Sequence, residues 1–199
     1  NYDIEDAGFG TWTFYGAAMI KYTLTVMPSN ALLIYNYAPV LQNPSAHSHA
    51  EMPRFEFHIW DQFQSDIDPV CGVYIVYGDN AGAQGFDSCY ISSPNAWGWV
   101  LYKNWTTVGV DLTPYMGQTI TLAFMALDCG QGGHFGYAYV DAQCAPLMIS
   151  SSYCVGGSNA VLTAPPGFTY LWNPGGQTTQ SITITNPVEG TAYNCTLTS

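Results

Sequence analysis

The stretch of residues 110–144 most constrains what this chain can fold into. Its sequence is VDLTPYMGQTITLAFMALDCGQGGHFGYAYVDAQC. It contains two runs with strand composition, 119–127 and 135–141, separated by a turn that carries three glycines. Glycine adopts the positive φ angles that tight turns require. Such a unit is too short to form a catalytic apparatus, and it predicts the closing hairpin of a β-sandwich.

Strand-like runs occupy most of the first 145 residues. Residues 19–27 and 31–40 are rich in β-branched, aromatic and aliphatic side chains, and 54–60 alternates strictly. The alternation predicts Phe55, Phe57 and Ile59 on one face and Arg54, Glu56, His58 and Trp60 on the other. Proline, glycine, asparagine and aspartate mark the breaks between runs, and no amphipathic helix longer than two turns is evident. The pattern predicts an all-β fold of the jelly-roll β-sandwich type.

Charge excludes several classes of partner. The 199 residues carry only three lysines and arginines against 14 acids, a net charge of −11. A nucleic-acid-binding surface needs a positive footprint, so we expect no nucleic-acid partner.

No apolar run approaches the roughly 20 residues that a membrane-spanning helix requires. The acidic surface would attract calcium, although excess acid also serves simply to keep a protein soluble.

The six cysteines, at positions 71, 89, 129, 144, 154 and 195, favour an oxidising compartment. Sequence alone leaves many pairings open. Local spacing favours the sequential set, namely Cys71–Cys89, Cys129–Cys144 and Cys154–Cys195. A zinc site built from these cysteines is the less favoured alternative, because the chain lacks a Cys-x-x-Cys pair.

Composition changes after Cys144, which predicts a domain of residues 1–145 followed by a module of residues 146–199. Cys154, Trp172 and the Tyr193-x-Cys195 pattern are typical of an immunoglobulin-like sandwich, in which a tryptophan packs on an intersheet disulfide. We expect a small Ig-like module, incomplete or truncated. The alternative is a C-terminal hairpin extension of the first domain.

Three segments, 31–61, 110–144 and 162–187, resemble large surface proteins of Bacteroidota. These are repeat-rich adhesins and gliding-associated proteins exported by type IX secretion, in which a jelly roll often precedes Ig-like or PKD-like repeats. The phrase VDLTPYMGQTI also resembles adhesin-type, MAM-like jelly rolls. The resemblance covers most of residues 20–199, excluding 79–102.

The resemblance implies a fragment of a large exported protein at the bacterial cell surface, associated with the outer membrane. The implied function is non-catalytic adhesion or display, with a glycan or protein as surface ligand and type IX secretion or surface-motility machinery as possible partners. The leading alternative is a carbohydrate-binding module of a secreted enzyme.

Acidic residues suggest calcium sites, since calcium is bound by six to eight oxygen ligands. Asp3, Glu5 and Asp6 cluster near the N-terminus and Asp141 follows the last long strand; in a jelly roll such strands often lie side by side. Resemblance to calcium-stabilised adhesin domains supports Asp141 in particular. A second cluster contains Asp61, Asp66 and Asp68, and ordinary turn acids are the alternative for both clusters.

Histidines suggest a second kind of metal site. On an extended chain His47, His49 and Glu51 would share a face and could bind zinc or copper. Pro44 and Pro53 bracket the stretch, which favours a solvated loop without metal.

Aromatic residues give the candidate binding site. Trp97, Trp99 and Tyr102 lie, with Tyr90 and Trp105, in a region rich in glycine, asparagine and serine. Such side chains contact glycans or proteins, although they also commonly cap a core. We find no nucleophile elbow, zinc-protease motif or phosphate-binding loop. The sequence therefore predicts no catalytic residues and no enzyme activity.

Overall fold

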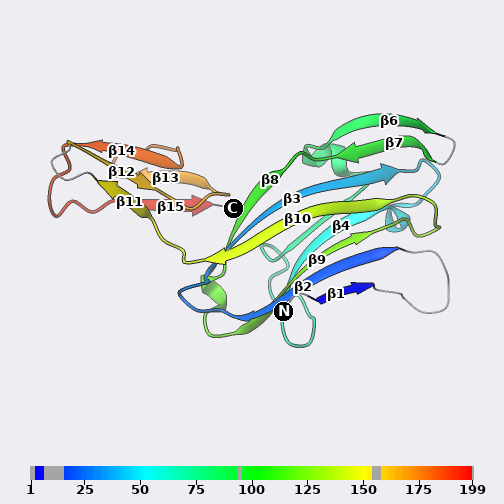
Figure 1. Ribbon diagram of the computed structural model, residues 1–199, viewed down its shortest axis with the longest axis horizontal. Coiled ribbons are helices and arrows are strands. Elements are labelled where there is room, and N and C mark those ends of the chain that lie inside the picture. Colours follow the sequence, from blue (N-terminus) through cyan, green and yellow to red (C-terminus); the bar gives the residue numbers. More distant parts are fainter. Residues whose placement is uncertain (1–2, 7–15, 94–95, 154–157, 199) are drawn as a thin grey trace. The chain divides into compact units, whose positions relative to one another are not determined.

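The computed structural model describes residues 3–6, 16–93, 96–153 and 158–198, and these form an almost entirely β protein (Figure 1). This confirms the predicted fold class. The strands are β1 (Asp3–Asp6), β2 (Ala17–Thr25), β3 (Leu32–Asn43), β4 (Arg54–Trp60), β5 (Val73–Tyr77), β6 (Asp87–Ser93), β7 (Ala96–Tyr102), β8 (Thr106–Asp111), β9 (Thr119–Leu127), β10 (Gly136–Ala145), β11 (Ser150–Tyr153), β12 (Asn159–Thr163), β13 (Thr169–Asn173), β14 (Ser181–Thr185) and β15 (Asn194–Thr198). Three short 3-10 turns are η1 (His49–Glu51), η2 (Ala81–Gln84) and η3 (Thr113–Tyr115). No helix in these ranges is long and apolar enough to cross a membrane.

Two sheets make up most of the N-terminal part. The first has the strand order β1-β2-β9-β4-β5, and the second has the order β10-β3-β7-β6, with β8 also pairing with β3. The ring of Tyr37 on β3 stacks on that of Phe55 on β4 at 5.5 Å and meets Tyr74 on β5 edge-on at 5.6 Å. These contacts join the inner faces of the two sheets, so the sheets form a sandwich.

Both strands of the predicted hairpin are present, but they do not pair with each other. β9 lies in the first sheet and β10 in the second, so the predicted hairpin is wrong and the glycine-rich turn connects the two sheets. β9 covers residues 119–127 as expected, and β10 begins at Gly136 and extends to Ala145. Gly132 and Gly133 in the turn have φ angles of 78° and 90°. These are left-handed conformations that glycine adopts without steric cost, which explains the glycine-rich turn.

The faces of β4 are as its alternation predicts. Phe55, Phe57 and Ile59 are almost fully buried in the core. Glu56 and His58, on the opposite face, are buried as well. The loop after β4 explains their burial, because Asp66 of that loop forms a β-bridge with Trp60.

The last five strands form a small sandwich of their own. One sheet has the order β11-β12-β14 and the other pairs β13 with β15. Trp172 is 1% exposed and packs with Ala164 and Ile182, as expected for the core tryptophan of an Ig-like module. Its indole Nε1 donates a 2.8 Å hydrogen bond to the carbonyl of Thr179, which satisfies the buried polar group.

The chain divides into two compact units. One contains Asn1–Val26, Asn36–Thr106 and Gly117–Asp141, and the other contains Met27–Tyr35, Thr107–Met116 and Ala142–Ser199. Inside the second unit, the Gly109 amide donates a 3.1 Å hydrogen bond to the Gly167 carbonyl, and a Cβ at either glycine would collide with the other segment. This close approach explains why Thr107–Met116 groups with the C-terminal strands. The boundary at residues 145 and 146 stays a prediction.

The described cysteines, at positions 71, 89, 129, 144 and 195, are free thiols. The predicted pairs Cys71–Cys89 and Cys129–Cys144 are therefore not formed in this structure. Cys129 precedes β10 and Cys144 is its penultimate residue, so nearly the whole strand separates them. A disulfide needs Cα atoms within about 7 Å. Cys154 lies outside the described residues, so Cys154–Cys195 stays a prediction.

Core burial makes a direct prediction for Phe57, which is 1% exposed. We expect Phe57→Ala to lower the free energy of unfolding by about 3–5 kcal/mol, because it removes buried apolar area and leaves a cavity. Urea denaturation measures this change. The control is Phe63→Ala, since Phe63 is 76% exposed and its loss should cost less than about 0.5 kcal/mol. Equal costs for the two variants would contradict the described core.

Candidate functional site

A row of aromatic rings lies along one face of β10, an edge strand of the second sheet. Phe135, Tyr137 and Tyr139 alternate along the chain and therefore share a face. Their ring centroids are 5.8 Å apart for Phe135 and Tyr137 and 5.9 Å apart for Tyr137 and Tyr139. Trp105 continues the row at 6.4 Å from Tyr139. We call these four residues the aromatic ladder.

The aromatic ladder borders an open groove of about 510 Å³. Its other lining residues come from β3, β6, β7 and the segment after β7, and are Ala38, Val40, Cys89, Ile91, Val100, Tyr102, Lys103 and Asn104. Tyr139 and Trp105 remain 60% and 59% exposed. Large aromatic rings are therefore available to a ligand above an apolar floor.

Lys103 is the one cation among the residues lining the groove, and it is already engaged. Its Nζ donates a 2.8 Å hydrogen bond to the carbonyl of Gln84 and lies 5.1 Å from the centre of the Phe86 ring. The polar groups left to a ligand are chiefly phenol hydroxyls and the Asn104 amide. The groove therefore suits a neutral ligand with hydroxyl groups.

The structure separates the residues that the sequence grouped as one binding site. Tyr102 lines the groove, whereas Trp99, an odd number of residues away on β7, lies on the opposite face. Trp99 is exposed and meets the ring of Tyr90 at 5.5 Å. The side chain of Trp97 lies outside the described part of the structure. Sequence reasoning missed Tyr137 and Tyr139, although the alternating FGYAY motif was a readable signal.

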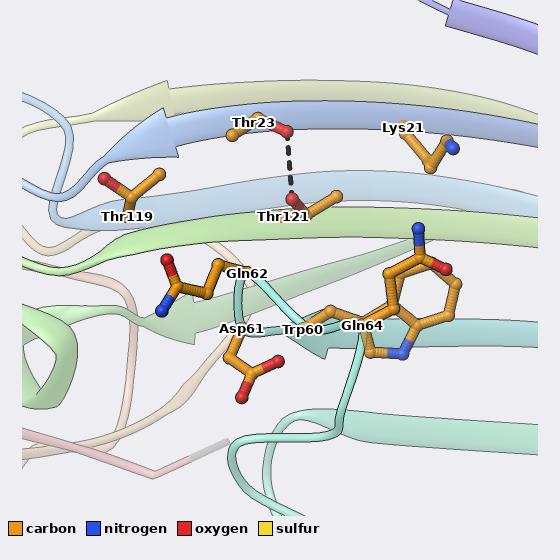
Figure 2. Close-up of a pocket in the computed structure, with 8 residues that line it drawn as sticks. All are labelled: Lys21, Thr23, Trp60, Asp61, Gln62, Gln64, Thr119 and Thr121. Atoms are coloured by element: carbon orange, nitrogen blue, oxygen red, sulfur yellow. Dashed lines mark hydrogen bonds between the residues drawn. The ribbon is translucent and has the colours of Figure 1, made fainter.

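A second pocket, of about 540 Å³, lies on the first sheet around a single indole (Figure 2). It is lined by Lys21, Thr23, Trp60, Asp61, Gln62, Gln64, Thr119 and Thr121. The Thr23 and Thr121 hydroxyls form a 2.9 Å hydrogen bond with each other across β2 and β9. This pocket is largely polar and offers one ring for stacking instead of four.

A partly buried chain of charged side chains runs along β4 and ends at Asp66 in the following loop. His58 lies between two carboxylates, with Nδ1 2.8 Å from Asp66 Oδ1 and Nε2 3.1 Å from Glu56 Oε2. Arg54 pairs with the other oxygen of Glu56. The hydrogen bond to Glu56 raises the pKa of His58, burial opposes it, and Asp66 raises it further. Burial alone would raise the pKa of Glu56, but hydrogen bonds from His58 and Arg54 outweigh burial and lower it.

The acids proposed as a second calcium cluster have local roles. Asp61 Oδ1 accepts hydrogen bonds from the amides of Phe63 and Ser65, and Asp68 Oδ1 accepts them from Val70 and Cys71. Both are turn-capping contacts. Asp66 binds His58, as described above. The alternative of ordinary turn acids accounts for these residues.

The first calcium proposal involves Asp3, Asp6 and Asp141. Asp141 lies on β10 in the second sheet and accepts a 3.5 Å hydrogen bond from Asn36. β1, which contains Asp3 and Asp6, pairs with β2 in the first sheet. The hydrogen-bonded partner of β10 in its sheet is β3, so the strand neighbours assumed for this site differ from those observed. Calcium at these residues stays a prediction.

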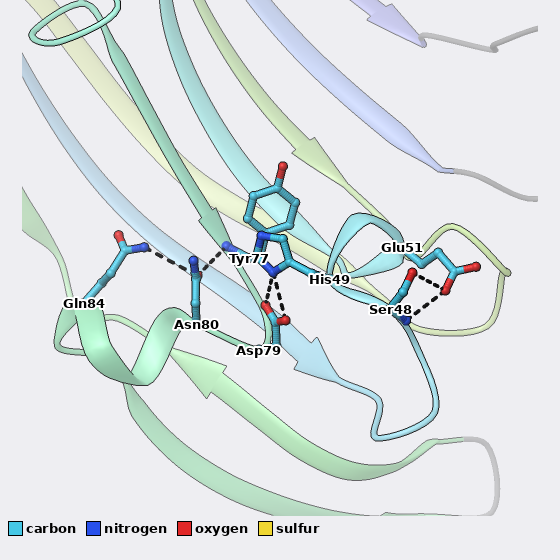
Figure 3. Close-up of polar contacts among 7 residues, drawn as sticks. All are labelled: Ser48, His49, Glu51, Tyr77, Asp79, Asn80 and Gln84. Carbon is cyan, nitrogen blue, oxygen red and sulfur yellow. Dashed lines mark hydrogen bonds and ion pairs between the residues drawn. The ribbon is translucent and has the colours of Figure 1, made fainter.

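His49 and Glu51 point to partners of their own (Figure 3). His49 Nδ1 lies 2.8 Å from Asp79 Oδ2, and its ring tilts against Tyr77 at 4.1 Å. Glu51 accepts hydrogen bonds from the Gln131 amide and from Ser48, and these lower its pKa to about 2. The expected alternative, a loop, is observed as the turn η1. The structure therefore does not gather His47, His49 and Glu51 into one metal site.

His47 instead joins two residues that are distant in sequence. Its ring meets that of His134 edge-on at 4.7 Å, and His134 Nδ1 lies 3.4 Å from Cys129 Sγ. Burial, together with the neighbouring His47, lowers the pKa of His134, so its imidazole is neutral at physiological pH. No short-range sequence signal marked this cluster.

No protein-family model, curated protein or solved structure was found to match the chain. The geometry of the molecule is therefore the basis for inferring its function.

The charge chain on β4 makes stability depend on pH. Because the folded-state pKa of His58 is raised, its stabilisation is full below its ordinary value of about 6.5 and is lost as pH rises through the folded value. We expect His58→Gln to lower the melting temperature by a few degrees more at about pH 5.5 than at about pH 8.5. Thermal unfolding followed by circular dichroism measures both values.

The control variant for this test is Gln62→Ala, at an exposed position without charge, whose effect should not change with pH. An effect of His58→Gln that is the same at both pH values would contradict the described charge chain.

Proposed function

We propose that the protein is a non-catalytic binding module that holds a neutral glycan in the groove beside the aromatic ladder. The single observation that carries this proposal is the ladder itself. Four neighbouring rings, most of them substantially exposed, border an apolar floor. Aromatic faces stack on the C–H faces of sugar rings, and the phenol and amide groups supply hydrogen bonds to sugar hydroxyls.

Charge supports a neutral glycan over other ligands. The chain carries a net charge of −11, which repels nucleic acids and acidic polysaccharides. Lys103, the cation beside the groove, already binds the Gln84 carbonyl. A neutral sugar carries no charge, so the acidic surface does not repel it.

The ladder also supports an extended ligand over a single sugar. Phe135, Tyr137 and Tyr139 occupy every second residue at the start of β10, and Trp105 continues their row, so the rings form a line instead of a cup. A chain of sugar units can contact several rings at once, and each ring adds stacking area. The single indole of the Trp60 pocket offers no such line.

Adhesion or display at a bacterial cell surface is the setting we propose for this binding. Its support is the resemblance of segments 31–61, 110–144 and 162–187 to type IX-secreted adhesins and gliding-associated proteins. The alternative setting is a carbohydrate-binding module of a secreted enzyme. Both settings use the same glycan-binding groove, and neither requires catalysis by this chain.

Glycan binding can be measured directly. A glycan array of neutral and acidic oligosaccharides would identify a ligand, and calorimetry would give its affinity. We expect saturable binding of a neutral oligosaccharide at millimolar concentration or better. Trp105→Ala and Tyr139→Ala should each weaken binding about tenfold or more, which corresponds to about 1.4 kcal/mol.

Two control variants each remove a tryptophan that lies outside the groove and is exposed or half-exposed. Trp60→Ala alters the second pocket and Trp99→Ala alters the opposite face of β7, so both should bind like the wild type. Loss of binding in Trp60→Ala with no loss in Trp105→Ala would contradict the assigned groove. Release of new reducing ends from the bound glycan would contradict a non-catalytic role.

A further inference from the structure

Three metal-ligating side chains converge beneath the turn between β9 and β10. One ligand atom of each of His47, Cys129 and His134 lies within 4.8 Å of the others. Cys129 is completely buried, so its thiol faces the two imidazoles instead of solvent. This cluster is separate from the aromatic groove and from the Trp60 pocket.

His47 is the unusual member of the cluster. Both of its ring nitrogens are buried, and neither has a hydrogen-bond partner in the described part of the chain. Buried polar side-chain atoms in folded proteins nearly always have a partner. An imidazole left with two unsatisfied nitrogens beside a thiol and a second imidazole indicates that a binding partner belongs among them.

Backbone contacts hold the cluster in place. The Cys129 amide donates a 3.0 Å hydrogen bond to the His134 carbonyl, which closes the glycine-rich turn. The next amide, of Gly130, donates a 2.7 Å hydrogen bond to the Glu51 carbonyl, and the Gln131 side chain donates one to the Glu51 carboxylate. These bonds tie the turn that carries Cys129 and His134 to the loop that carries His47. Fixed ligand positions of this kind are what a metal site requires.

We propose that His47, Cys129 and His134 bind one thiophilic transition-metal ion, Cu⁺ or Zn²⁺. A thiolate and two imidazoles are the ligands that zinc and copper prefer, whereas calcium and magnesium require oxygen ligands. The donor set differs from both the calcium ligands and the His47, His49 and Glu51 set that the sequence suggested.

Coordination number distinguishes the two ions. The cluster supplies three protein ligands, and zinc completes its tetrahedron with a fourth ligand such as water. The buried thiol and the buried His47 nitrogens leave little access for solvent. This enclosure favours three-coordinate Cu⁺ over Zn²⁺.

The experiment uses the full chain, reduced and freed of metal with a chelator. Cu⁺ and Zn²⁺ are titrated separately against chromophoric chelators, and Co²⁺ is added as a spectroscopic probe of thiolate ligation. We expect one equivalent of ion to bind and the cobalt form to show a thiolate-to-metal charge-transfer band. Tighter retention of Cu⁺ than of Zn²⁺, each relative to its competing chelator, is the expected order.

Variants assign the ligands. Cys129→Ser and His134→Ala should each weaken metal affinity by about 100-fold or more. Replacing a residue that only hydrogen-bonds to a metal ligand typically weakens affinity by about 10–100-fold. Cys144→Ser and His49→Ala are matched controls, because they remove a thiol and an imidazole outside the cluster, and both should bind normally.

The cobalt spectrum of the wild-type protein needs no variant and so does not depend on how well a variant folds. A spectrum without thiolate ligation, no stoichiometric binding of either ion, or unchanged affinity in Cys129→Ser would each overturn the proposal. Failure of glycan binding would leave it intact, since the two sites use different residues.

Discussion

The packing of β3 against β4 and β5 is the interaction on which the rest of the N-terminal part depends. Tyr37 stacks on Phe55 and contacts Tyr74, so the second sheet meets the first through large aromatic surfaces. Because side chains alternate along a strand, fixing the inward residues also fixes the outward ones. The residues available for binding are therefore set by the same alternation that builds the core.

Scarcity of cations shapes what these outward faces can bind. Of the three lysines and arginines, Arg54 pairs with Glu56 and Lys103 binds the Gln84 carbonyl. Lys21 is the only other lysine or arginine, so neutral and acidic groups dominate the surface. Aromatic rings and hydroxyl groups thus supply most of its recognition chemistry, which is why a neutral ligand fits this molecule better than an anionic one.

Local patterns predicted several of the strands but not the sites. β6 and β7 were missed, because their region was interpreted only as one rich in glycine, asparagine and serine. The alternation in 54–60 gave the correct faces of β4. The glycine-rich turn after Cys129 lies between two strands as expected, but these strands belong to different sheets instead of forming a hairpin. The aromatic groove combines side chains from β3, β6, β7 and β10, and strand order within a sheet is not encoded in any short segment. Trp99 and Tyr102 were grouped because they are close in sequence, whereas strand geometry places them on opposite faces.

The metal-ligating cluster shows the same limit more sharply. His49 and Glu51 lie two and four residues from His47, yet the turn η1 directs them to Asp79 and to Ser48 and Gln131. Cys129 and His134, which do meet His47, come from the turn between β9 and β10, more than 80 positions further along the chain. Only the tertiary fold brings them together.

The turn between β9 and β10 connects the two proposed sites. The aromatic ladder begins at Phe135, immediately after His134, and the Phe135 carbonyl accepts a 3.0 Å hydrogen bond from the amide of Gln42 on β3. An ion held by Cys129 and His134 would restrain the turn from which the ladder starts. Ordering a binding surface before the ligand arrives lowers the entropic cost of binding. A metal in this position would therefore act on the groove as a structural brace, with no need to contact the glycan.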